Sequence, residues 1–145
     1  RHLLPTFAHL LAAAASAASL LAGLSYSATV ASATPPPCSN ITLKGTYLYN
    51  HTGVLNGKPY AESGREVYDG QGGTVLSFQG SDGSGGMEKA TYSVSIDCIS
   101  TTNYPDGQKA TGFISPDGSR LVYTITAAPG SKTTALSGLE VRVAP

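Results

Sequence analysis

From residue 44 onward, apolar and polar side chains alternate along the chain with a period of two, which is typical of strands that bury one face. In residues 88–97, every second side chain is apolar: Ala90, Tyr92, Val94 and Ile96. A later segment repeats the pattern with Leu121, Tyr123 and Ile125. Residues 34–145 nowhere sustain the 3.6-residue period of a helix. The pattern therefore predicts an all-β domain.

Tight turns separate these segments at regular intervals. Several dipeptides pair Asn or Asp with Gly, whose tolerance of positive φ suits hairpin turns: Asn56-Gly57, Asp69-Gly70, Asp82-Gly83, Asp106-Gly107 and Asp117-Gly118. Pro129-Gly130 adds another turn, and the long gap after Asp82 predicts one more near Cys98 to Thr101. Turns about every dozen residues are typical of a β-barrel or a β-sandwich.

The turns divide the chain into about eight strands. We expect them at residues 44–53, 59–68, 73–80, 88–97, 99–104, 108–115, 119–127 and 133–143. Because tight turns join neighbouring strands, the expected topology is an antiparallel meander. Closing the meander into a barrel removes its two unpaired edges, so a small up-and-down barrel is favoured over a sandwich.

A barrel of this size has room for packed side chains or for one small ligand. Its candidate ligand-binding residues are the tyrosines on faces expected to point inward: Tyr47, Tyr49, Tyr92 and Tyr123. A tyrosine offers an apolar ring together with a hydroxyl that can orient a bound molecule. The competing interpretation is that these tyrosines simply fill the barrel.

Two predicted strands carry charged residues, and their inward and outward faces are assigned from the same alternation. In residues 133–143, the apolar Leu139, Val141 and Val143 are expected inside, opposite Glu140 and Arg142. In residues 59–68, Glu62 and Glu66 share a face with Arg65 opposite, and we interpret this group as a solvated edge.

Residues 1–33 differ in composition from the rest of the chain. They contain no Asp or Glu, an apolar stretch at residues 10–24, and the small-x-small sequence Ala31-Ser32-Ala33. We predict a signal peptide over 1–33 that is cleaved before Thr34, followed by a linker over 34–43 and a barrel over 44–145. A retained membrane anchor is the alternative, although the apolar stretch is shorter than the roughly 20 residues that span a bilayer. The expected location is secreted or periplasmic, with membrane contact only through an uncleaved signal segment.

The chain has two cysteines, Cys38 and Cys98. In an exported chain they can form only one intramolecular disulfide, which would tie the segment before the first strand to the rim of the barrel. Two separate buried thiols are the alternative.

Composition excludes several classes of function. Charged residues make up 12% of the chain, and nine Lys and Arg balance nine Asp and Glu, so no nucleic-acid partner is expected. His51 is the only histidine after residue 33. A site with several histidine ligands and a second candidate for a histidine-based triad are therefore excluded from the mature chain. We predict no catalytic residue, no metal and no cofactor.

Two sequences fit the N-glycosylation pattern, at Asn40 and at Asn50. Asn50 lies on a predicted strand, so Asn40 is the better candidate. A chance occurrence in a polar β protein is at least as good an explanation.

The segment Gly45-Thr46-Tyr47 resembles the Gly-x-Trp start of lipocalin-type barrels, with Tyr in place of Trp. The resemblance implies that a basic residue of the last strand, here Arg142, covers the aromatic ring of Tyr47. Since the alternation points Arg142 outward, this contact requires a bulge, for which Gly138 is the candidate.

A wider pattern runs from Cys38 through Gly45-Thr46-Tyr47 and Asp69-Gly70-x-Gly72 to Asp97-Cys98. It is similar to a group of small exported microbial proteins of unassigned function with a calycin-like barrel. The resemblance implies that fold and a shared disulfide, and it implies no activity.

These observations favour an exported barrel that binds a small apolar or aromatic ligand. One alternative is a cofactor-free isomerase or cyclase of the allene-oxide-cyclase barrel type, which rests on fold analogy. Another is a structural or adhesive surface protein without a ligand. A large cavity with a buried Glu or His51 facing it favours the enzyme, whereas a filled barrel with an exposed apolar patch favours the surface protein.

Overall fold

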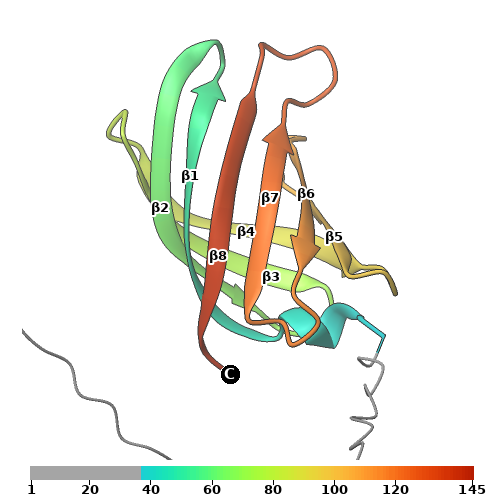
Figure 1. Cartoon of the computed structure of the whole chain (residues 1–145). Helices are drawn as coiled ribbons and strands as arrows, with labels where there is room; N and C mark the ends of the chain where they lie inside the picture. Colours follow the sequence, from blue (N-terminus) through green and yellow to red (C-terminus); the bar gives the residue numbers. More distant parts are fainter. Residues whose placement is uncertain (1–36) are drawn as a thin grey trace, which may run out of the picture. The chain divides into compact units, whose positions relative to one another are not determined.

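The computed structural model describes residues 37–145, so the predicted signal peptide and its cleavage site lie outside the described residues. Eight antiparallel strands form a closed barrel in which each strand pairs with its neighbours in the chain and the first pairs with the last (Figure 1). The strands are β1 (Gly45–Leu55), β2 (Lys58–Tyr68), β3 (Gly73–Gly80), β4 (Gly85–Val94), β5 (Ile99–Asn103), β6 (Lys109–Ile114), β7 (Arg120–Thr126) and β8 (Ala135–Ala144). The predicted all-β meander barrel is confirmed.

The turn between β4 and β5 lies earlier than predicted. It occupies residues 95–98, where the amide of Cys98 donates to the carbonyl of Ser95 at 3.0 Å and Cys98 has a φ of 61°. Strand β4 therefore ends at Val94. The prediction that Ile96 points inward is wrong, because Ile96 sits in this turn and is exposed.

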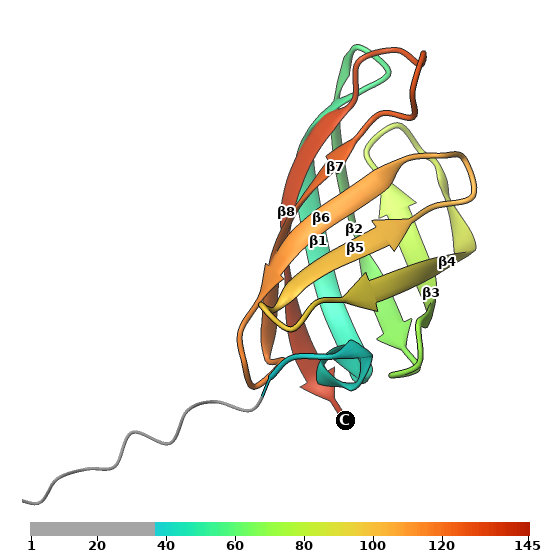
Figure 2. The ribbon, with the colours of Figure 1, turned by 90° about the vertical axis from the view of Figure 1, so that its right-hand side faces the viewer.

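A single turn of 3-10 helix, η1 (Asn40–Leu43), covers the end of the barrel where β1 begins (Figures 1 and 2). Leu43 is fully buried there. The side chain of Asn40 fixes η1 by accepting a hydrogen bond from the Val94 amide at 2.8 Å and donating one to the Gln71 carbonyl. The Tyr92 hydroxyl adds a bond to the Asn40 carbonyl at 3.0 Å. We call this the closed end of the barrel.

A disulfide joins Cys38 to Cys98, with 5.0 Å between the two Cα atoms. The predicted pairing is confirmed. The bond connects the segment before η1 to the β4–β5 turn, so it fastens the closed end to the wall of the barrel.

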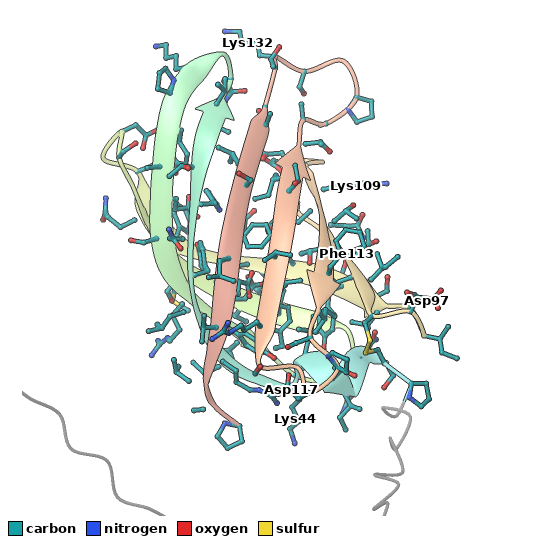
Figure 3. The ribbon with its side chains drawn as sticks, viewed as in Figure 1. Lys44, Asp97, Lys109, Phe113, Asp117 and Lys132 are labelled. Carbon is teal, nitrogen blue, oxygen red and sulfur yellow. A yellow bond between two sulfur atoms is a disulfide. The ribbon has the colours of Figure 1, made fainter. Side chains whose placement is uncertain are left out.

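The interior faces of two strands differ from the sequence prediction. Glu140 is buried, whereas Leu139, Val141 and Val143 are exposed, so the assignment of faces in β8 was wrong. Glu66 is likewise buried rather than part of a solvated edge. The outward residues of β8 join neighbours on β6 and β7 in one row, where Phe113 pairs with Val122 and Val122 with Leu139. Figure 3 shows Phe113 on the outer side of β6.

The reversed face of β8 brings Arg142 inward without a bulge at Gly138. The pairing with β1 is regular at Gly138 and shifts only between Thr46 and Tyr47. The Arg142 guanidinium carbon lies 5.9 Å from the centre of the Tyr47 ring, as the lipocalin resemblance implied. Tyr47 itself is fully buried, and its hydroxyl donates to the Gly118 carbonyl.

Within residues 37–145, no helix has the length and apolar character that a membrane crossing requires.

Candidate functional site: a polar cavity at the open end

We call the end of the barrel opposite η1 the open end (Figure 1). A cavity of about 90 Å³ occupies the interior there. Six aromatic side chains contribute to its wall: Tyr49, His51, Tyr60, Phe78, Tyr104 and Tyr123.

His51 projects from β1 into this cavity and is only 5% exposed. Its Nδ1 lies 3.1 Å from the Tyr123 hydroxyl. Its Nε2 is buried and has no hydrogen-bond partner among the described residues. The nearest acidic atom, Oε1 of Glu62, lies 3.7 Å from Nε2. Burial lowers the pKa of His51 and outweighs the opposing effect of Glu62, so the ring is neutral at neutral pH.

Glu62 of β2 connects two of the tyrosines that line the cavity. Its carboxylate accepts hydrogen bonds from the Tyr49 hydroxyl at 2.7 Å and from the Tyr60 hydroxyl at 2.6 Å. Burial, together with these bonds, raises the pKa of Tyr60 to about 12 and that of Tyr49 further. Both hydroxyls therefore stay protonated and remain donors to Glu62 at neutral pH.

Glu66 and Glu140 are both buried in the barrel, and their carboxyl groups lie close enough for each to affect the pKa of the other. Glu66 also accepts a bond from the Thr74 hydroxyl at 2.8 Å, and Glu140 accepts from the Tyr68 hydroxyl at 3.1 Å. Burial raises the pKa of Glu66 to about 7 and that of Glu140 well above its usual value. Two buried carboxyls in contact cannot both ionise, so the pair retains a proton at neutral pH. Only Glu66 of the two lines the cavity.

Two glycines make room for the ring cluster on β1. A Cβ at Gly64 of β2 would come within 2.8 Å of the Tyr49 ring. A Cβ at Gly138 of β8 would come within 2.7 Å of both the His51 side chain and the Tyr123 hydroxyl. Glycine at these positions lets the side chains of Tyr49 and His51 pack directly against the backbone of the neighbouring strands.

The four tyrosines predicted to bind a ligand all point inward, but they do not meet at one site. Tyr49 and Tyr123 line the cavity. Tyr47 and Tyr92 belong to the closed end, where their hydroxyls bond to backbone carbonyls. A role in binding stays a prediction for Tyr49 and Tyr123, whereas the positions of Tyr47 and Tyr92 argue against one.

The sequence prediction of ligand-binding residues missed His51, Glu62 and Glu66, which line the cavity, and Glu140, the partner of Glu66. For His51, Glu62 and Glu66 a signal was available, because His51 shares the face of Tyr47 and Tyr49, and Glu62 and Glu66 share one face of β2. Between residues 37 and 145, no group of three or more His, Cys, Asp or Glu side chains is arranged to hold a metal ion.

The structure reverses the order of the two candidate glycosylation sites. The Asn40 side chain is engaged in the bonds that fix η1, so it is a poor acceptor for a sugar. Asn50 lies on the outward face of β1 and is exposed. Modification of either residue stays a prediction.

Comparison with known proteins identifies no family. No family model matches the chain, and no curated protein matches it. Among solved structures, a redesigned β-barrel, mFAP1 bound to DFHBI, is similar with 19% identity and a TM-score of 0.49, over 71% of this chain and 97% of the other.

Proposed function

We propose that the protein is an exported binding module that takes a small molecule with an apolar or aromatic body into the open end of the barrel. The observation that carries the proposal is His51, which lines the cavity and whose Nε2 is buried and has no hydrogen-bond partner within residues 37–145. A buried polar atom without a partner costs about 1–3 kcal/mol, and a ligand that bonds to it recovers this free energy.

The cavity sets the size and shape of the ligand. Its volume of about 90 Å³ is small beside the 300–1,000 Å³ that is usual for drug-sized ligands, so a compact molecule is expected. The rings of Tyr49, Tyr60 and Tyr123 supply apolar walls, while His51 supplies the atom expected to bond to the ligand.

Export is supported by the Cys38–Cys98 disulfide, since such bonds persist in oxidising compartments. N-terminal sequencing of secreted material tests this part of the proposal. We expect Thr34 as the first residue, and a secreted chain that retains residues 10–24 would contradict it.

Native mass spectrometry of protein purified from its producer tests ligand binding directly, because a bound small molecule adds mass. A second measurement uses the single histidine of residues 34–145. With ¹⁵N-labelled histidine, the secreted protein gives one imidazole, and we expect its Nε2 signal to move when the ligand is removed. Unchanged mass together with an unchanged Nε2 signal would contradict the proposal.

A second candidate function is a cofactor-free isomerase or cyclase, which the Glu66–Glu140 pair favours. Glu66 lines the cavity with a pKa of about 7, which suits a group that accepts and returns a proton near neutral pH. The reaction would move a proton within one substrate, so no cofactor is needed. Conversion of the co-purified molecule by wild-type protein but not by Glu66→Gln would establish this function, and release of an unchanged molecule from both would exclude it.

A further inference from the structure

The charges around the cavity are all of one sign. Four acidic residues line it: Glu62, Glu66, Glu88 and Asp106. In the described part of the chain, no Lys or Arg lies among the lining residues. Lys89 and Lys109, which directly follow the lining residues Glu88 and Gln108, are exposed. Lys58 and Lys132 border a separate surface groove, and Figure 3 shows Lys132 on the loop between β7 and β8.

We propose that the ligand is a small organic cation, a protonated amine on a compact aromatic or apolar body, whose ammonium group binds between His51 and Glu62. This inference rests on the proposed binding function and names the chemical class of the ligand. An anion would be repelled by the acidic side chains of the lining, which holds no Lys or Arg among the described residues, and a neutral molecule would leave the carboxylates without a counter-charge.

The geometry at His51 supplies two acceptors for one ammonium. When Nδ1–H donates to the Tyr123 hydroxyl oxygen, Nε2 carries a lone pair that has no partner, and both His51 and Glu62 line the cavity. Oε1 of Glu62 is 3.7 Å from this nitrogen, which is too long for a bond between the two but short enough for one group to contact both. An ammonium has several N–H donors and can bridge these two acceptors.

The aromatic walls favour a cation as well. The ring centroid of His51 lies 5.7 Å from that of Tyr49, 6.2 Å from that of Tyr60 and 6.1 Å from that of Tyr123. Faces of such rings attract cations, and the attraction grows where water is excluded. The neutral His51 ring adds no positive charge that would oppose an ammonium.

Three probes with one shared ring test the inference: benzylamine, which is protonated at neutral pH, the neutral benzyl alcohol and the anionic benzoate. Each is titrated into ligand-stripped protein by calorimetry at about pH 8, above the pKa of Glu66 of about 7. We expect benzylamine to bind roughly tenfold more tightly than benzyl alcohol, because bonds to charged groups exceed neutral ones by about this factor. Benzoate should bind least.

Glu62→Gln removes the charge at the proposed site and keeps the shape of the side chain. It should abolish most of the preference for benzylamine over benzyl alcohol, and an unchanged circular dichroism spectrum shows that the variant is folded. Asp97→Asn is the matched control, because it removes one charge from an exposed turn at the closed end (Figure 3). It should retain the full preference.

The outcomes separate this inference from the proposed function. If benzyl alcohol or benzoate binds at least as tightly as benzylamine, the proposal of a cationic ligand is wrong, whereas the proposed binding function is retained. A preference for benzylamine that survives Glu62→Gln, or that falls equally in Glu62→Gln and Asp97→Asn, overturns the site. Failure of all three probes to bind overturns the binding module and the cation together.

Discussion

The two ends of the barrel are built from similar residue types but differ in how their polar atoms are used. At the closed end, Tyr47 is fully buried and its hydroxyl bonds to the Gly118 carbonyl, with Arg142 beside its ring. At the open end, His51 is buried with one nitrogen unbonded. Among the described residues, this nitrogen is the one buried side-chain nitrogen or oxygen without a partner.

The comparison separates the structural part of the barrel from its candidate site. The closed end gains stability from the disulfide, from η1 and from side chains whose bonds are complete. The open end contains a cavity, a buried nitrogen of His51 without a hydrogen bond, and the buried carboxyl groups of Glu66 and Glu140, whose pKa values are raised. Each of these features disfavours folding. Unfavourable features collected at one end are typical of a functional site.

The largest expected effect comes from removing the disulfide at the closed end. Replacing Cys38 and Cys98 with alanine should lower the free energy of unfolding by about 4 kcal/mol, because the bond closes a long loop in the unfolded chain. Urea denaturation measures this change. Peptide mapping without reductant should recover the joined peptides, and two alkylatable thiols in native protein would show that the bond is absent in solution.

The second prediction compares the loss of stability when one tyrosine at each end is replaced with alanine. Tyr47→Ala should cost about 3 kcal/mol or more, because it leaves a cavity among packed side chains. Tyr123→Ala should cost less, since it enlarges a cavity that already exists and that water can enter. Arg142→Ala should cost about 1 kcal/mol through the lost contact with the Tyr47 ring. Chemical denaturation of the three variants gives the order, and a neutral Tyr47→Ala would contradict the structural role of the closed end.

The third effect is a dependence of stability on pH that originates at the open end. The pKa of Glu66 is raised from 4.5 to about 7 in the folded protein, so the unfolded chain releases this proton first as the pH rises. The contribution of this group to stability is then fully present below pH 4.5 and is lost as the pH rises toward about 7, by roughly 3 kcal/mol. Glu140, whose pKa is also raised, acts in the same direction.

Glu66→Gln should flatten this slope and make the protein more stable than wild type at pH 8. Unfolding curves between pH 4 and pH 8 test the expectation. The exposed Asp117, with a pKa lowered to about 2, acts in the opposite direction but only at lower pH. His51, whose pKa is lowered, adds stability as the pH rises toward its ordinary value, so the test is the difference between wild type and Glu66→Gln. A difference that stays constant from pH 4 to pH 8 would contradict the shared proton.

The sequence was sufficient to predict the strands, because tight turns and alternation are local properties of the chain. The alternation also identified the inward faces of β1 and β7, where the interior residues are aromatic or aliphatic. It failed for β8, because period two separates the two faces of a strand without saying which face is buried. In β8 the interior carries Leu136, Gly138, Glu140 and Arg142, while Leu139, Val141 and Val143 face outward.

The candidate site was only partly predictable for the same reason. Tyr49 and Tyr123 were identified as ligand-binding candidates, because a tyrosine on an apolar face fits a barrel interior. Glu62 and Glu66 were assigned to solvent, since charged residues are rarely buried without partners. Their partners, which include Tyr49, Thr74 and Glu140, come from other strands, so only the closed barrel brings them together.

The pairing of β1 with β8 also has a consequence for how the chain folds. Thr46 pairs with Ala144, so the contact that closes the ring joins residues at opposite ends of the domain. Until β8 is available, both β1 and β7 present an unpaired edge, and the Glu66–Glu140 pair cannot form. Topologies dominated by such distant contacts fold slowly and stay open to aggregation while they do so. Docking of β8 therefore completes the fold, because the closed sheet and the Glu66–Glu140 pair form together in that step.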